Sequence, residues 1–127
     1  MSDTLSPSSA DGVLAAVQEA FAQAQPLEIV GRGTKRGWGR AVKSNRILDL
    51  SGLSGLTLYE PDELVLSAKA GTPMAEIEAL LAANRQMLAF EPPDLGDVFQ
   101  TQRARQTLGG VIACNLSGPR RIKAGAA

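Results

Sequence analysis

The chain has 127 residues, which is enough for one domain with a modest hydrophobic core. Hydrophobic residues make up 44% and charged residues 20%, as in ordinary globular proteins, and 13 cations balance 13 anions, so net charge gives no argument for nucleic-acid binding. Histidine is absent, which excludes imidazole-based zinc sites and Ser-His-Asp triads, and the lone Cys114 excludes an intrachain disulfide and favours a reducing compartment.

Residues 1–25 are predicted to form a polar lead-in followed by one helix. The first residues lack the basic and apolar regions of a secretory signal, so we expect them to be frayed and the protein to be cytoplasmic. Over residues 10–25 the apolar positions recur at spacings of three and four, which predicts an amphipathic helix with Ser8, Ser9 or Asp11 as its N-cap. No apolar run reaches the roughly 20 residues of a membrane span.

Short strands are predicted to dominate the next part of the chain. They cover residues 27–31, 46–50, 56–59 and 64–70. The acidic segment 60–63 separates the last two strands and contains a proline, which is typical of a turn. Its carboxylates are therefore expected to be solvated rather than to form an acid–base pair.

A second helix is predicted to begin after Gly71, with Thr72 as its N-cap and Pro73 at its first position, and to end near Asn84. Its buried face would consist of Met74, Ile77, Leu80 and Leu81. A short strand is expected at residues 87–90, whereas residues 94–106 are polar and have no clear pattern. The fold class predicted by this order is α+β, a small mixed sheet flanked by helices.

The glycine-rich loop IVGRGTKRGWGR, residues 29–40, raises the first question of function. It fails as a dinucleotide fingerprint because Gly37 comes one residue late and no helix follows, and it fails as a P-loop because Trp38 follows that glycine. What remains is a backbone nest for phosphate, with charge from Arg32, Lys35 or Arg36. An ordinary basic surface loop is the alternative, and the loop by itself favours it.

A second glycine segment, TLGG at residues 107–110, changes that balance. Thr107 can cap a short helix whose first turn holds Gly109 and Gly110, and glycines there cost roughly 1 kcal/mol each relative to alanine. Such a cost makes sense where a ligand or another backbone must approach closely. Two nests in one small domain would suit a diphosphate. Trp38, between them in sequence, could cover a ring of the ligand or pack its own loop, and the second role is favoured.

The motifs GRGTK, LDLSGLSGL, ELVLSAKAGTPMAEIEALLAANRQMLAFEPPD and TLGGVIACNLSGPRR occur in that order over residues 26–125. Together they resemble the FAD-binding domain of the vanillyl-alcohol oxidase and p-cresol methylhydroxylase type, and they are similar to the FAD-binding subunits of bacterial glycolate oxidases. The resemblance implies two α+β subdomains with FAD between them. Residues 26–127 would be the N-terminal part of this domain, truncated before its remainder.

The resemblance also implies a set of cofactor-binding residues. Those that would wrap the pyrophosphate are Gly31, Arg32, Gly33, Thr34 and Lys35. Those that would line the flavin are Pro92, Thr107, Leu108, Gly109, Gly110, Ala113, Asn115, Ser117 and Gly118, with Arg120 and Gly125 near the cofactor. No catalytic residue and no metal ligand is assigned, because the residues that contact substrate in this family come from beyond this part of the domain.

The absence of histidine argues against a His-linked flavin, so the FAD would be non-covalent, and Cys114 is expected to be a small core residue. The implied function is oxidation of a 2-hydroxy acid, glycolate, to a 2-oxo acid. The implied partners are a second flavoprotein subunit and an iron–sulfur subunit, through which the chain could lie at the inner membrane. The alternative is a remnant or interaction module that binds no flavin, and the fragment alone is expected to be inactive.

Overall fold

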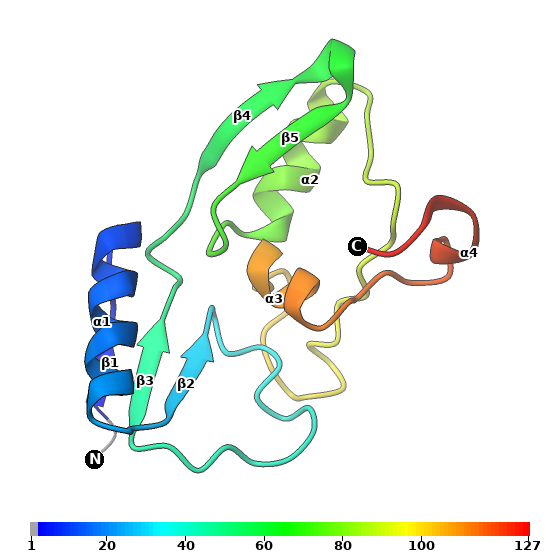
Figure 1. Cartoon of the computed structure of the whole chain (residues 1–127). Helices are drawn as coiled ribbons and strands as arrows, with labels where there is room; N and C mark the ends of the chain where they lie inside the picture. Colours follow the sequence, from blue (N-terminus) through cyan, green and yellow to red (C-terminus); the bar gives the residue numbers. More distant parts are fainter. Residues whose placement is uncertain (1–2) are drawn as a thin grey trace.

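Two small sheets joined by helices make up the structure, a computed structural model that describes residues 3–127 (Figure 1). In chain order the elements are β1 (Asp3–Leu5), α1 (Ala10–Ala22), β2 (Leu27–Val30), β3 (Arg46–Asp49), β4 (Leu56–Glu60), the 3-10 helix η1 (Pro61–Glu63), β5 (Val65–Ala68), α2 (Met74–Ala83), α3 (Leu108–Ala113) and α4 (Arg121–Ala124). The predicted α+β class is confirmed, but parallel and antiparallel pairing occur in separate sheets.

The first sheet is entirely parallel, in the order β1-β3-β2. Leu48 in the central strand lies between Leu5 on β1 and Ile29 on β2 and is only 1% exposed. Ser9 is the N-cap of α1, and its hydroxyl accepts a hydrogen bond from the N–H of Gly12 at 3.1 Å, so Ser9 is the cap among the three predicted candidates.

The prediction of a frayed lead-in is wrong for residues 3–5, which form β1, whereas residues 1 and 2 lie outside the described part. The N–H of Asp3 donates to the carbonyl of Asn45 at 2.8 Å, and its carboxylate pairs with Arg46 at 3.3 Å. Three residues are too few to show an alternating pattern. The formation of this strand therefore depends on its pairing with β3 and not on a pattern in its own residues.

The second sheet is the antiparallel hairpin β4–β5, and it packs on α2. Met74, Ile77 and Leu81 form the buried side of α2, as predicted, while Leu80 is only half-buried. These three side chains meet Val111 and Leu116 in one hydrophobic core. α3 therefore belongs to the core of the hairpin unit, and Figure 1 shows it between the two sheets.

Thr72 is not the N-cap of α2, and Pro73 stands at that position instead of inside the helix. The Thr72 side chain is fully buried, and its hydroxyl accepts from the N–H of Gly55 at 3.0 Å and donates to the Gly55 carbonyl at 3.2 Å. A threonine just before a proline and a helix normally suggests a cap. Here the hydroxyl is hydrogen-bonded to the loop after β3. This is a tertiary contact that the local sequence does not reveal.

The strand predicted at residues 87–90 is also absent, because no strand lies beside it. Leu88 and Phe90 instead pack against the core while the backbone stays irregular. The N–H of Glu91 then donates to the carbonyl of Ser117 at 2.9 Å. Residues 94–106, which showed no pattern, contain no helix or strand.

A short junction connects the two sheets through backbone contacts between residues 70–74 and 106–109. Four of its hydrogen bonds are Met74 N–H to Gln106 O at 3.0 Å, Leu108 N–H to Thr72 O at 2.9 Å, Gly109 N–H to Ala70 O at 2.8 Å and Gly71 N–H to Leu53 O at 2.8 Å. The last bond attaches the junction to the loop that leaves β3. A Cβ at Gly71 would lie 2.2 Å from the carbonyl oxygen of Leu50, so this position requires glycine.

We predict that Gly71→Ala lowers the free energy of unfolding by at least about 2 kcal/mol, because the added methyl group must displace buried backbone. Gly52→Ala is the matched control, since a Cβ there meets no atom closer than 3.4 Å. Urea unfolding followed by circular dichroism compares the two variants. Equal stability of the two would contradict the close approach at Gly71.

Candidate functional site

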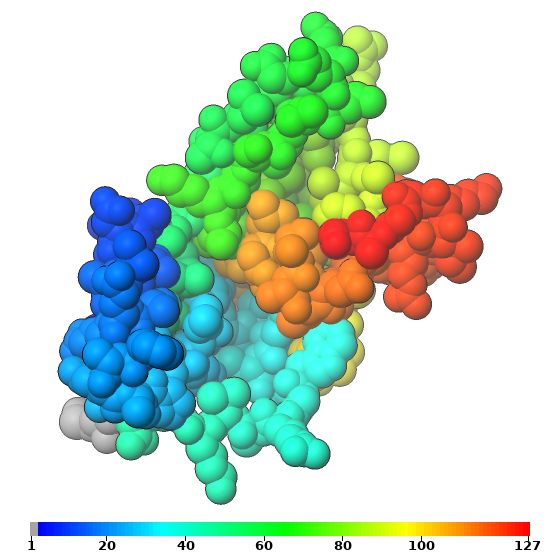
Figure 2. Space-filling view, viewed as in Figure 1, coloured from blue at the N-terminus to red at the C-terminus, as the bar shows by residue number. Residues whose placement is uncertain are grey.

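A pocket of about 490 Å³ lies at the carboxyl end of β2, between the loop that leaves this strand and α3. Figure 2 shows this loop, in cyan, side by side with α3, in orange, on one face of the molecule. β2 and β3 are neighbouring parallel strands, yet residues 31–45 connect them without a helix. Ligands of open α/β sheets bind where parallel strands end, so the position of the pocket is itself informative.

Residues 31–35, called the nest loop here, present a row of free backbone donors. Within residues 3–127, none of their five backbone N–H groups donates a hydrogen bond to another protein atom. Gly33 has φ +67°, a left-handed conformation that glycine adopts without strain. Successive N–H groups around a left-handed residue form a concave anion site. The free donors and the left-handed Gly33 are compatible with the predicted phosphate nest.

The positive charges near the nest loop are divided between two roles. Arg36 makes a bidentate ion pair with Glu28 on β2, at 2.7 and 2.6 Å, and its guanidinium holds the pKa of that carboxyl below its usual range. Arg46 pairs with Asp3 at 3.3 Å and with Glu19 at 3.6 Å. These two arginines are thus neutralised within the protein, which disfavours a uniformly basic nucleic-acid surface.

Lys35 differs from them because it has no carboxylate within ion-pair distance among the described residues. Its ammonium donates to the side-chain oxygen of Gln106 at 3.3 Å and to the Thr34 hydroxyl at 3.5 Å. Burial lowers the pKa of Lys35, an effect that Cys114 and Asp94 nearby oppose in part. A half-buried cation without a counter-ion, beside five free N–H groups, favours binding of an anion.

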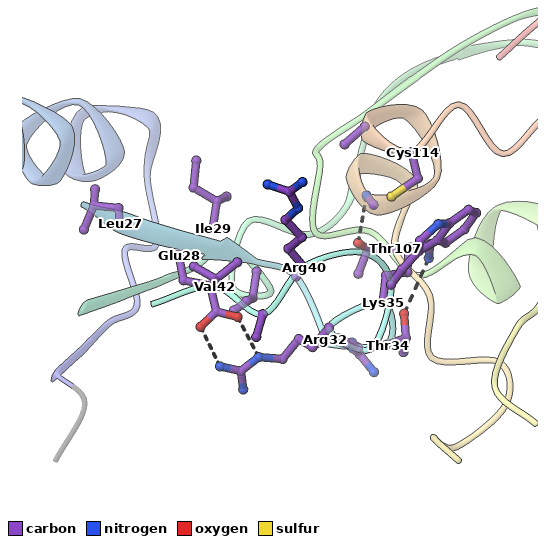
Figure 3. Close-up of a pocket in the computed structure, with 18 residues that line it drawn as sticks. Leu27, Glu28, Ile29, Arg32, Thr34, Lys35, Arg40, Val42, Thr107 and Cys114 are labelled. Atoms are coloured by element: carbon purple, nitrogen blue, oxygen red, sulfur yellow. Dashed lines mark hydrogen bonds and ion pairs between the residues drawn. The ribbon is translucent and has the colours of Figure 1, made fainter. Parts of the chain in front are cut away.

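α3 forms the opposite wall of the pocket, where Thr107, Gly110, Ala113 and Cys114 face the nest loop (Figure 3). Thr107 caps this helix as predicted, and its hydroxyl accepts from the N–H of Gly110 at 3.3 Å. A Cβ at Gly31 would lie only 2.6 Å from that hydroxyl oxygen. The glycine thus lets the nest loop approach the helix closely.

The first turn of α3 is not a second free nest. The N–H groups of Leu108 and Gly109 donate to carbonyl groups of the junction, and those of Gly110 and Val111 donate to Thr107. Gly109 is required because a Cβ there would lie 2.8 Å from that of Ala70. Of the two explanations for these glycines, close approach of another backbone is the one found for Gly109.

Eight of the predicted cofactor residues do not line this pocket: Leu108, Gly109 and a second group of six, which consists of Pro92, Asn115, Ser117, Gly118, Arg120 and Gly125. Arg120 pairs with Glu91 at 3.1 Å, and a Cβ at Gly118 would lie 2.1 Å from the Glu91 carbonyl oxygen. Ser117 is buried and donates to the side-chain oxygen of Asn115 at 2.8 Å. Leu108 points elsewhere, since it packs against the core.

The expectation that Cys114 is a core residue is wrong, because it is exposed and lines the pocket. The apolar sequence around it is that of a short helix whose buried residue is Val111. Sequence reasoning also missed Gln106, which is buried and holds Lys35. Its position directly before the Thr107 cap was the only local signal, and it carried no information about a partner 71 residues away.

Within the described part of the chain, no cluster of three or more His, Cys, Asp or Glu residues could hold a metal ion. No helix there is both long and apolar enough to span a bilayer.

Comparisons with known proteins agree with this architecture. A family model described as an FAD binding domain matches residues 4–127. The glycolate oxidase subunit GlcE of Escherichia coli (strain K12) is 40% identical over 109 residues, which are 86% of this chain and 29% of that protein. A solved alkyldihydroxyacetonephosphate synthase superposes with a TM-score of 0.69 at 23% identity, covering 97% of this chain and 22% of that one, and so supports the fold.

The chain therefore spans less than a third of the length of either relative. Its junction, its glycine-bearing nest loop and all of its parallel sheet except Asp3 lie within the matched residues. From the family match and the identity to the GlcE subunit, this chain belongs to the FAD binding domain family, in its p-cresol methylhydroxylase type.

Proposed function

We propose that this chain binds FAD non-covalently and that its nest loop, residues 31–35, holds the pyrophosphate of the cofactor. The observation that carries the proposal is the row of five backbone N–H groups without an acceptor among residues 3–127, centred on the left-handed Gly33. Such donors fit a diphosphate, whose oxygens are acceptors only. Lys35, which has no carboxylate partner in the described part of the chain, supplies the matching charge.

The second group of predicted residues would then approach the flavin itself. Asn115 is held by the hydrogen bond that the buried Ser117 donates to its side-chain oxygen, so its side chain would be ordered before the ring binds. Residues 26–127 would form the N-terminal part of the FAD domain. When bound, FAD would supply the redox chemistry, and the residues of this chain would bind and orient it.

We further propose that the chain acts within a flavoprotein subunit of the glycolate oxidase kind, which oxidises a 2-hydroxy acid to a 2-oxo acid. The support is the 40% identity to a protein named as a glycolate oxidase subunit. The proposed partners are a second flavoprotein subunit and an iron–sulfur subunit, and the proposed location is the cytoplasm, at the inner membrane through these partners. To test this assignment, the complex is isolated by a tag on this chain. The rate of dye reduction is then measured with glycolate and, for comparison, with lactate.

Cofactor binding is tested first by the visible spectrum of the purified chain and by titration with FAD. Saturable binding that releases on denaturation, leaving a colourless polypeptide, is the expected result for a non-covalent flavin. A chain that shows no saturable binding would contradict the proposal and favour the alternative of an interaction module.

Gly33→Val is predicted to weaken FAD binding at least tenfold, because a β-branched residue disfavours positive φ and would turn the N–H groups away from the phosphates. The matched control is Gly55→Val. Gly55 also has positive φ, with open space around its Cβ position, but it lies away from the pocket. Both variants should lose stability, because each places a β-branched residue at positive φ. Equal FAD affinity in the two would contradict the nest.

Lys35 gives a prediction about pH. Burial lowers its pKa from 10.5, so the ammonium that attracts phosphate is lost earlier as the pH rises than for an ordinary lysine. Binding of ADP, measured by calorimetry, should therefore weaken as the pH rises toward 10.5. Lys35→Arg should bind with little pH dependence, because arginine stays charged.

The matching neutral variant is Lys35→Met, which should bind ADP about tenfold more weakly at neutral pH, since charged hydrogen bonds contribute about 1.5–3 kcal/mol. Lys43→Met, which removes a lysine that lies outside the pocket, is its control. A pH dependence that persists in Lys35→Met would assign the titration to another group.

A further inference from the structure

Trp38 lies three residues after the nest loop and lines the same pocket. Its backbone N–H donates to the carbonyl of Lys35 at 3.0 Å, so a single turn fixes its distance from the phosphate nest. The sequence left two roles open for this residue, packing its own loop or covering a ring of a ligand.

Packing against the protein accounts for only part of the indole. Phe99 braces it, with the ring centroids 6.0 Å apart and the planes tilted by 35°. Gly37 allows this contact, because a Cβ there would lie 3.0 Å from the Phe99 ring. Even so, Trp38 remains 48% exposed. A braced aromatic ring that keeps half of its surface open is a preformed platform for stacking.

The residues that line the rest of the pocket differ in polarity. The nest loop gathers free donors and the Lys35 charge, whereas Ala41, Val42, Ala113 and Cys114 contribute uncharged surface. Arg40 also lines the pocket, and within residues 3–127 it has no ion pair. A site with anion donors at one end and an exposed aromatic face beside them suits a phosphate ester that carries a planar ring.

We propose that Trp38, held in place by Phe99, is the stacking wall for a planar ring of the bound nucleotide. The shared chemistry is an aromatic heterocycle attached to phosphate, which in FAD comes either from the adenine or from the isoalloxazine. The inference rests on the proposed function, because the nest loop must first hold the phosphates.

The chain contains a single tryptophan, so its intrinsic fluorescence reports on this site alone. Titrations of the full chain with FAD, ADP, FMN and inorganic pyrophosphate, followed by emission and by calorimetry, separate the parts of the ligand. ADP carries the adenine and FMN the flavin, whereas pyrophosphate carries no ring. A flavin quenches tryptophan by energy transfer without contact, so the affinities of variants decide the question.

Trp38→Leu should bind FAD about tenfold more weakly, since stacking of a base on an aromatic side chain contributes about 1–3 kcal/mol. The same loss should appear for one of the two partial ligands: a loss for ADP identifies the adenine as the stacked ring, and a loss for FMN identifies the isoalloxazine. The affinity for pyrophosphate should stay unchanged. Trp38→Tyr should restore most of the affinity because it restores a ring. Phe21→Leu, which removes an exposed aromatic residue from α1, should leave every affinity unchanged.

Two outcomes would overturn the inference. Unchanged affinities of Trp38→Leu for FAD, ADP and FMN would show that the indole only packs its loop. Loss of pyrophosphate binding together with the other ligands would show that the substitution damaged the nest loop. If instead the unmodified chain bound neither FAD nor pyrophosphate, the proposed function would fail, and the stacking role with it.

Discussion

The structure depends on one crossing of backbones, the junction between residues 70–74 and residues 106–109. Its hydrogen bonds leave no room for side chains at Gly71 and Gly109, where a Cβ would meet atoms at 2.2 and 2.8 Å. Residues 53 and 55, which follow the parallel sheet, and α2, which supports the hairpin, both attach to it. Without this crossing, the two sheets would share few contacts, and α3 would have no fixed position against the nest loop.

The electrostatics of the pocket follow from how the cations are partnered. Arg36 and Arg46 are paired with carboxylates and fix the loop and the sheet, whereas Lys35 is held by a neutral amide. A neutral partner keeps the lysine in place without cancelling its charge. The pairing thus leaves the charge of Lys35 available inside the pocket of a chain with zero net charge.

Much of this arrangement could be predicted from sequence, because local patterns encode it. Spacing within a few residues specifies the cap at Thr107, the buried face of α2 and the strand that precedes the nest loop. The strand β1, the burial of Thr72 and the exposure of Cys114 depend on contacts with distant segments. The same is true of the contact between Lys35 and Gln106. No local pattern reports such contacts, so prediction failed there.

The two walls of the pocket differ in how far apart along the chain their contacts lie. The ion pair between Arg36 and Glu28 joins residues eight apart, whereas the bond from Lys35 to Gln106 spans 71 residues. Local contacts cost little loop-closure entropy and form early in folding. We therefore expect the nest loop to take its shape before α3 reaches it, so that the wall contributed by α3 is the last part of the pocket to form.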